Sequence, residues 1–423
     1  MNRFTRNCIL QAGWMLAFLL SSACGSISAQ SFIPEKHFRT EPYPDFPEGH
    51  STWGDIGYNP VDGKVYVGVT NHADKVALYS FETGVRKMEK LGLIHDLAFL
   101  RDYQWQGKIH TKIIFDKQGN VIFGTDGGEN RQEYLMEHPR GYSGGYLMKW
   151  DIASRQLTNW GVPMQYESLK DVEIDPETGK IFAISYPQVH FLEIDPAGNK
   201  VTDHGRLGSS HVPRVLFSDF WGNCYYVDWR QRLIKFEKSS GRLVFARESL
   251  PAYPGTPGGH IITGITSFAK DEKNKCIYFI TYGSKVIRFT PVQTGIGKVE
   301  DLGCVYEIDR EPRWGYYVPN LNLGANGKLY YIIGGHGHFA KKDLTILMEL
   351  DPATKKQRIL YEFPLDEMVE STGSDIRDSS GNLYFAARKH VKKTGSGAQQ
   401  EGEASDYTSS PFLFIFNPEK PVQ

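Results

Sequence analysis

Side chains that can bind acids or move protons recur at one kind of position in this sequence, where an apolar run begins or ends. His110 stands at the start of the hairpin GKIHTKIIFDKQGNVIFGTDGG, and Tyr186 and Arg214 stand at comparable places further along the chain. Arginine holds a carboxylate or sulfate through two parallel hydrogen bonds, while histidine and tyrosine serve as acids or bases. Aromatic rings offer flat faces to a sugar ring. Together these residue types favour a site for an acidic carbohydrate.

Further candidates for substrate binding occupy equivalent positions in other parts of the chain. They are His72, Lys170, Trp229, Arg230, Tyr282, Asn320, His336, His338 and Arg388. The hairpins around them change little from one place to the next, whereas the residue types at these positions vary. Such variation at a fixed structural position predicts a binding site. The alternative is that each residue is a polar cap of a strand end with a local partner.

The elements that must position these residues repeat seven times. Each unit is a β-rich run, a tight turn and a second β-rich run, as in IDPETGKIFAIS and RDSSGNLYFAAR, and a third strand follows. The turn residues lie 43 to 60 residues apart and are Gly63, Gly119, Gly179, Gly222, Asn274, Gly327 and Gly381. Glycine or asparagine suits a turn with positive φ. The spacing predicts an all-β fold, a seven-bladed β-propeller of four-stranded antiparallel blades, rather than a two-sheet sandwich.

A propeller would bring the candidate residues together. The first strand of each blade runs beside the central channel and the second returns antiparallel to it, so residues before the first strand and after the second share one face. The connections after the second strand are long in blades two, six and seven, and long loops on a rigid scaffold are where ligands are usually bound. We therefore expect the site at this mouth of the channel.

The N-terminal residues indicate export. Residues 1–29 are expected to be a signal peptide, because Arg3 and Arg6 precede an apolar run and small residues follow it. Cys24 is alternatively the lipid-bearing cysteine of a lipoprotein. Residues 30–423 are expected to form a single propeller domain, periplasmic or at the cell surface, which contacts a membrane only through such an anchor. We expect a monomer.

Composition excludes some partners. The net charge is -1, so no general basic field is present to bind nucleic acid. Cys224, Cys276 and Cys304 are an odd number without a CxxC motif, which disfavours a disulfide scaffold or a zinc site, and we expect them to be buried. His336 and His338 form a possible metal pair, but no third ligand is fixed by spacing. Metal content stays open, and no cofactor is required.

An exported seven-bladed propeller with His110, Tyr186 and Arg214 at one mouth resembles the ulvan lyases and the related bacterial hydrolases that remove rhamnose from glucuronate. The resemblance covers most of the mature chain in architecture. It implies a polysaccharide lyase acting by β-elimination on a uronic-acid-containing polysaccharide or oligosaccharide. By this resemblance His110 and Arg214 neutralise the uronate carboxylate, and Tyr186 is the base and acid. Charge neutralisation of this kind is commonly the largest catalytic contribution.

Other functions remain open at this stage. The rhamnose-removing hydrolases are described with a single histidine near the mature N-terminus on the opposite face, which implies His50 in EGHSTWGDIGYNP; the alternative is that His50 caps the N-terminal segment. A conventional glycosidase needs two carboxylates about 5 to 9.5 Å apart, for which the candidates are Asp55, Asp126, Asp171 and Asp375. A non-catalytic propeller that binds a glycan or a protein is the remaining class.

Overall fold

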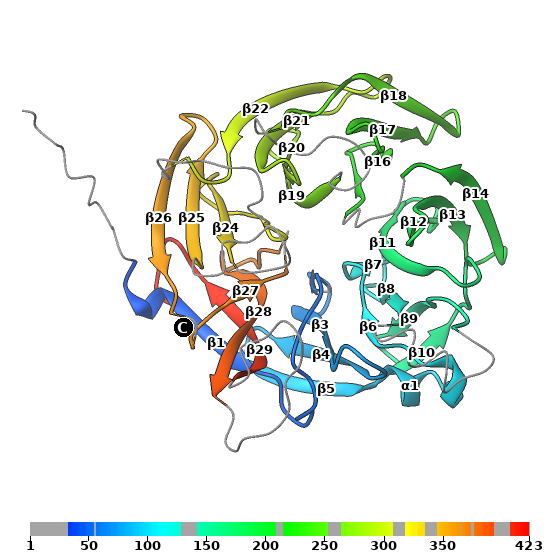
Figure 1. Ribbon diagram of the computed structural model, residues 1–423, viewed down its shortest axis with the longest axis horizontal. Helices are drawn as coiled ribbons and strands as arrows, with labels where there is room; N and C mark the ends of the chain where they lie inside the picture. Colours follow the sequence, from blue (N-terminus) through cyan, green and yellow to red (C-terminus); the bar gives the residue numbers. More distant parts are fainter. Residues whose placement is uncertain are drawn as a thin grey trace, which may run out of the picture. The chain divides into compact units, whose positions relative to one another are not determined.

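Tight turns join neighbouring strands, so the strands of the described residues pair in antiparallel order and form seven sheets. The computed structural model describes residues 33–54, 56–127, 142–208, 215–252, 264–307, 318–334, 345–364, 366–373, 376–392 and 407–422. Figure 1 shows the sheets around a central hub in the order of the sequence. The predicted all-β, seven-bladed β-propeller is confirmed.

Within the described ranges, five blades consist of four consecutive strands each. Blade one contains β2 (Ile56–Asn59), β3 (Lys64–Thr70), β4 (Val76–Glu82) and β5 (Lys87–Leu93). Blade three contains β11 (Ser168–Ile174), β12 (Ile181–Tyr186), β13 (His190–Asp195) and β14 (Lys200–Arg206). Blade four contains β15 (Phe217–Ser218), β16 (Cys224–Val227), β17 (Arg232–Glu237) and β18 (Arg242–Ser249). Blade five contains β19 (Ile265–Asp271), β20 (Cys276–Thr281), β21 (Lys285–Thr290) and β22 (Lys298–Cys304). Blade six contains β23 (Asn322–Leu323), β24 (Leu329–Ile333), β25 (Ile346–Asp351) and β26 (Lys356–Glu362).

Blade two has an interrupted inner strand. Its strands are β6 (Lys108–Ile109), β7 (Ile114–Phe115), β8 (Val121–Asp126), β9 (Leu147–Asp151) and β10 (Gln156–Asn159). Both β6 and β7 pair with β8, and the residues between them form no strand. The side chain of Thr111 replaces part of the missing ladder, because its Oγ1 accepts a hydrogen bond from the backbone nitrogen of Gly124 at 2.9 Å. His110 lies in this interruption.

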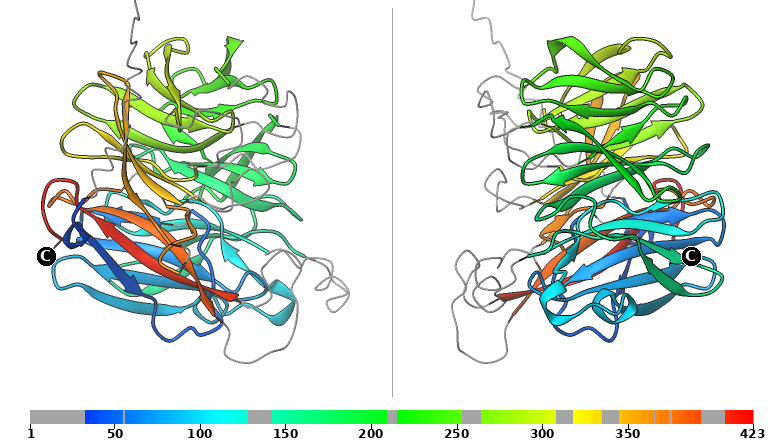
Figure 2. Two further views of the ribbon diagram at one scale, coloured as in Figure 1. Left: turned by 60° about the vertical axis from the view of Figure 1, so that its left-hand side comes forward. Right: turned by 90° about the vertical axis from the view of Figure 1, so that its right-hand side faces the viewer.

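Blade seven is completed by the N-terminal part of the chain. It contains β27 (Glu370–Ser371), β28 (Leu383–Lys392) and β29 (Tyr407–Phe416), and its outer strand is β1 (Phe38–Pro42). In the pairing of β1 with β29, Phe38 lies opposite Phe416 and Pro42 opposite Phe412. Figure 2 shows the blue β1 beside the red β29. This pairing closes the ring.

Apolar clusters between neighbouring blades form the core. Phe217 of blade four stacks on Phe279 of blade five with ring centroids 5.7 Å apart, and Phe289 packs against both rings. Burial of each such side chain contributes roughly 1.5–3 kcal/mol. Helix is confined, among the described residues, to η1 (Glu35–His37), α1 (Ile94–Leu97) and η2 (Asp102–Gln104). None of the helices there is long and apolar enough to cross a membrane.

The turns follow the predicted pattern with one correction. The six predicted turn glycines have positive φ, for example 72° at Gly179 and 83° at Gly381. In blade five, however, the residue with positive φ is Lys275 at 49°, not the predicted Asn274. The amide of Asn274 donates to Asp271 Oδ2 at 2.7 Å, and its backbone nitrogen donates to Asp271 Oδ1 at 3.0 Å. Asn274 therefore anchors the turn to Asp271, and Lys275 takes the left-handed backbone conformation.

The three cysteines of the described chain are free thiols. Cys224, Cys276 and Cys304 are all buried, as expected from the sequence. Burial raises the pKa of each thiol above its usual value. These cysteines therefore act as small apolar side chains in the core.

Candidate functional site

Blades two and three bring three of the predicted residues together. His110 follows β6, Lys170 lies in β11, and Tyr186 ends β12. The ammonium nitrogen of Lys170 lies 2.5 Å from Nε2 of His110 and 5.2 Å from the centre of the Tyr186 ring. The rings of His110 and Tyr186 are 6.2 Å apart and nearly perpendicular. The imidazole of His110, the ring of Tyr186 and the ammonium group of Lys170 thus lie next to one another.

The position of Lys170 depends on a β-bulge. In the pairing of β11 with β12, Leu169 lies opposite Ser185 and Asp171 opposite Ile184, so Lys170 is an extra residue with no partner in the ladder. Bulges re-aim side chains and are frequent beside functional sites. Here the bulge is the element that lets Lys170 reach His110.

His110 is held on both ring nitrogens. Its Nδ1 donates to Asp126 Oδ2 at 2.7 Å, and its Nε2 accepts from Lys170. The exposed fractions of His110 and Asp126 are 6% and 0%. Burial holds the pKa of His110 well below its usual value, and the charges of Lys170 and Lys108 lower it further, against the opposing effect of Asp126. The partners on the two nitrogens assign the neutral imidazole with its proton on Nδ1.

A second layer of side chains fixes Asp126. Its Oδ1 accepts a hydrogen bond from Ser168 Oγ at 2.9 Å. Ser168 Oγ lies 3.2 Å from the hydroxyl of Tyr142. Because both carboxylate oxygens have partners, Asp126 can orient the His110 ring rather than rotate freely.

Trp53 and His72 beside blade one, with Lys108 of blade two, add an aromatic and cationic wall to the site. The ring of Trp53 stacks on His72 with a centroid distance of 4.7 Å and an interplanar angle of 9°. The ammonium of Lys108 lies 4.8 Å from the Trp53 ring centre and 3.3 Å from His72 Nε2. The Trp53 ring is also 6.2 Å from the ring of His110. The wall therefore continues into the group formed by His110, Lys170 and Tyr186.

His50 lies on the same side of the propeller as His110, not on the opposite face that the hydrolase resemblance implies. Its Nε2 donates to the backbone oxygen of Asn71 at 2.8 Å, and its ring is 6.2 Å from that of His72. Since His72 stacks on Trp53, which contacts His110, an unbroken series of ring contacts joins His50 to His110. The bond between His50 and Asn71 arises because the segment before β2 runs beside the end of β3.

Four other predicted residues lie in blades four, five and seven. Trp229 is 41% exposed, and the guanidinium of Arg230 covers its ring at 4.6 Å. Tyr282 follows β20 and is buried. Arg388 in β28 forms an ion pair with Glu370 in β27 and donates to Ser409 Oγ at 3.0 Å. The Trp229 and Arg230 pair is thus a cation–π contact at the protein surface.

Asn320 is a correction to the predicted substrate-binding set. Its exposed fraction is 0%, its Nδ2 donates to the backbone oxygens of Ile332 and Ser371, and its Oδ1 accepts from the nitrogen of Ile332. A fully buried amide bound to the backbone of two blades is a structural clamp and has no contact with solvent.

Several predicted residues lie outside the described residues, namely Arg214, His336, His338, Asp55 and Asp375. The remaining candidate carboxylates, Asp126 and Asp171, are fully buried and bound to protein groups. In the part of the chain that the structure describes, no three His, Cys, Asp or Glu side chains group in a way that could hold a metal ion.

Two solved structures resemble this chain over most of its length. The structure of U3-55K has a TM-score of 0.54 and 12% sequence identity, and the match covers 90% of this chain and 98% of that one. The crystal structure of RRP9 WD40 repeats has a TM-score of 0.51 and 11% identity, with 90% and 97% covered. The chain shares the β-propeller fold of these structures. At such low identity the likeness concerns the arrangement of the blades alone.

No family model matches the sequence, and no curated protein matches it. The resemblance to ulvan lyases and rhamnosyl-glucuronate hydrolases therefore stays a prediction.

Sequence reasoning missed Lys108 as a member of the site. Lys108 is two residues before His110, and alternate residues of an extended chain share a face, so the spacing contained the signal. The family resemblance implied that His110 neutralises the substrate carboxylate. The buried His110 ring is neutral, however, and the positive charge at the site comes from Lys108 and Lys170. Composition alone does not show that Lys108 and Lys170 are buried beside His110.

Proposed function

We propose that this protein is an exported polysaccharide lyase that cleaves a uronic-acid-containing glycan by β-elimination. The observation that carries the proposal is the meeting of the His110 imidazole, the Lys170 ammonium and the Tyr186 ring at the mouth of the hub, next to Trp53 and Lys108. This set combines positive charge for an acid, aromatic faces for a sugar and a phenol for proton transfer. No metal or organic cofactor is required by the proposed chemistry.

Binding of the acidic sugar depends on the two lysines and the two aromatic rings. Lys108 and Lys170 pair electrostatically with the uronate carboxylate, and a partly buried, water-poor site strengthens such a pairing. The rings of Trp53 and Tyr186 offer faces to the apolar side of the pyranose. The lysines take the role that the family resemblance gave to His110 and Arg214.

In the proposed reaction Tyr186 begins as the phenolate and removes the proton from C5 of the uronate, beside the carboxylate, which converts Tyr186 to the phenol. The C5–H electron pair forms the C4–C5 double bond, the bond between C4 and the glycosidic oxygen breaks, and that oxygen takes a proton from Tyr186. Lysine charge stabilises the carboxylate as negative charge develops on it. His110, anchored by Asp126, holds the ammonium of Lys170 in place through Nε2.

A panel of acidic polysaccharides and oligosaccharides tests the proposal. A lyase produces an unsaturated uronate that absorbs in the ultraviolet, whereas a hydrolase releases reducing sugar without that absorbance. Tyr186→Phe is expected to abolish elimination, and Tyr361→Phe, at the outer strand of blade six, is the matched control that retains it. His50→Ala distinguishes the hydrolase alternative, since it would remove hydrolysis but leave elimination intact. If no substrate yields either an unsaturated uronate or a reducing sugar, the enzyme proposal is overturned.

A non-catalytic propeller that binds an acidic glycan is the second candidate. It is favoured by the engagement of both ring nitrogens of His110 with protein groups, which suits a rigid binding surface as well as a catalyst. This candidate predicts measurable affinity without turnover. It also predicts that Tyr186→Phe leaves the affinity unchanged, since the ring face remains.

A further inference from the structure

Two irregular segments of neighbouring inner strands face each other at the site. In blade two, His110 and Lys112 lie in the interruption between β6 and β7. In blade three, Lys170 is the extra residue of the bulge and Asp171 follows it. His110 contacts Lys170, and Lys112 contacts Asp171. The two irregular segments are therefore joined by two adjacent contacts.

These paired contacts depend on the bulge. His110 and Lys112 are two residues apart, whereas their partners Lys170 and Asp171 are neighbours in sequence. Adjacent residues of a regular strand point to opposite faces, so a regular strand would direct only one of the two partners toward blade two. The extra residue of the bulge changes this alternation. The geometry around His110 thus depends on keeping the irregular segments in register.

The ion pair of Lys112 with Asp171 is well placed to maintain that register. Asp171 is fully buried, its Oδ1 accepts from the backbone nitrogen of Lys112 at 2.9 Å, and its Oδ2 accepts from Lys112 Nζ at 2.7 Å and from the nitrogen of Leu216 at 2.7 Å. Lys112 Nζ also donates to the oxygen of Leu216 at 2.8 Å and lies 3.6 Å from Glu173. One pair therefore ties together blades two, three and four.

We propose that Lys112 and Asp171 are positioning residues that fix the contact of His110 with Lys170, and thereby keep the His110 proton on Nδ1. Neither residue has to touch the sugar. The pair acts through the backbone, because Lys112 is two residues from His110 and Asp171 is next to Lys170. This role goes beyond the proposed lyase activity, since it holds whether the bound glycan is cleaved or only bound.

The tautomer of His110 is the direct readout. In protein labelled with ¹⁵N-histidine, the wild-type His110 is expected to show one protonated and one unprotonated ring nitrogen, and the variant His110→Gln assigns these signals. Asp171→Asn is expected to move both nitrogen signals toward the averaged values of exchanging tautomers. Because an unpaired buried charge strongly destabilises a fold, the double variant Lys112→Gln with Asp171→Asn removes both charges together and provides the second test.

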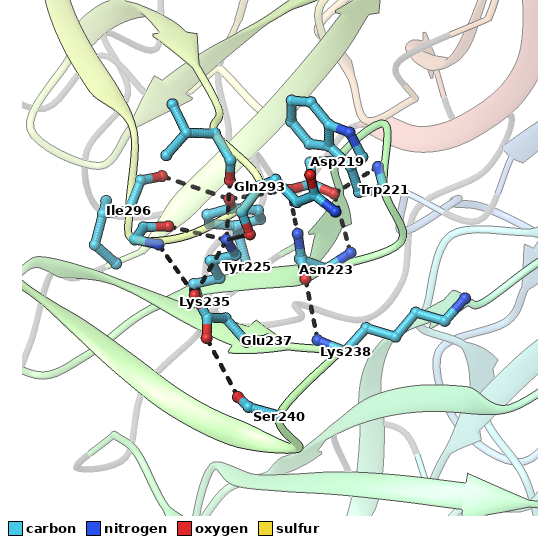
Figure 3. Close-up of polar contacts among 12 residues, drawn as sticks. Asp219, Trp221, Asn223, Tyr225, Lys235, Glu237, Lys238, Ser240, Gln293 and Ile296 are labelled. Carbon is cyan, nitrogen blue, oxygen red and sulfur yellow. Dashed lines mark hydrogen bonds and ion pairs between the residues drawn. The ribbon is translucent and has the colours of Figure 1, made fainter.

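Lys235 offers a matched control, because it is another buried lysine that ties neighbouring blades. Its ammonium donates to the backbone oxygens of Val292, Gln293 and Gly295 at 2.9, 2.7 and 2.9 Å, as Figure 3 shows in part. It thus joins β17 of blade four to the turn between β21 and β22 of blade five. Lys235→Met is expected to lower the thermal stability and leave the His110 signals as in the wild type.

Movement of the His110 signals in the Asp171 variants, without movement in Lys235→Met, supports the positioning role. Folded Asp171 variants with wild-type His110 signals would overturn it, as would an equal change in Lys235→Met, which would mean that general loosening is responsible. Absence of activity on every acidic glycan, with the tautomer still responding to Asp171→Asn, would reject the lyase proposal and leave the positioning role standing.

Discussion

The ammonium nitrogen of Lys170 lies 2.5 Å from Nε2 of His110, on the side of the ring opposite its bond to Asp126. Burial and the lysine charges together hold the pKa of His110 well below its ordinary value. Lys170→Met is expected to raise this pKa, because a positive neighbour is removed. Asp126→Asn is expected to lower it further, because the group that favours the charged ring is lost. An NMR titration of His110 measures both changes, and shifts in the reverse directions would contradict the arrangement.

The low pKa of His110 also makes folding stability depend on pH. The unfolded chain protonates His110 near its ordinary value of 6.5, whereas the folded chain does so only at much lower pH. The contribution to stability is therefore complete above pH 6.5 and is lost as the pH falls toward the folded value, by at most about 1.4 kcal/mol per pH unit. Denaturant unfolding between about pH 7.5 and about pH 5.5 should show a smaller loss in His110→Gln than in the wild type. Equal losses in both proteins would refute this linkage.

Lys108 is expected to supply affinity for the acidic group of the ligand. Its ammonium lies 4.8 Å from the Trp53 ring and beside His72. Lys108→Met should weaken binding of a uronate oligosaccharide about tenfold, which is about 1.4 kcal/mol. Calorimetric titration measures the change, and a carboxyl-reduced oligosaccharide should bind wild type and variant equally. Lys90→Met, which removes a lysine bound to the Asp45 backbone on the outer surface, should leave affinity unchanged.

Phe38 is expected to stabilise the closed ring. Its ring lies 5.0 Å from Tyr361 and 5.6 Å from Phe414, so it packs the N-terminal strand against blades six and seven. Phe38→Ala should lower the free energy of unfolding by about 2–4 kcal/mol, since a partly buried aromatic contact is lost. Phe99→Ala is the control, because Phe99 is 91% exposed and should change stability little. Similar midpoints for wild type and Phe38→Ala in denaturant would argue against this role.

Asp219 is expected to stabilise the turn of blade four. Its carboxylate accepts hydrogen bonds from the nitrogens of Trp221 and Asn223 and from the hydroxyl of Tyr225, as seen in Figure 3. Asp219→Ala removes the acceptor that these donors share, and of these residues Asn223 and Tyr225 are buried, so it should lower stability by about 2 kcal/mol. Asp151→Ala changes a turn aspartate with an exposed environment and should have a much smaller effect. Thermal unfolding of the two variants compares them directly.

The fold was predictable because its signals are local. Most blades have a turn glycine with positive φ, such as Gly179, between two apolar runs. Both features can be recognised in the sequence. The predicted turn residue is wrong only in blade five, where Lys275 and not Asn274 has the positive φ. A pattern of turn glycines and asparagines does not select a lysine at such a position.

The site was predictable only in part. His110 and Tyr186 were placed at the mouth by their positions in the repeat, and their rings do meet. The bulge that directs Lys170 toward His110, and the neutral state that Lys170 and Lys108 impose on the ring, arise between blades and have no local sequence signal. Asn320 shows the converse, since a polar residue at an equivalent position became a clamp between two blades.

The pairing of β1 with β29 has a consequence for the order of assembly. The strand Phe38–Pro42 emerges early in synthesis, yet its partner Tyr407–Phe416 is made almost last. Contacts that span so much of a chain form slowly, because a large loop must close before they stabilise anything. We therefore expect the pairing of the two ends of the chain to form late, after contacts within and between the other blades.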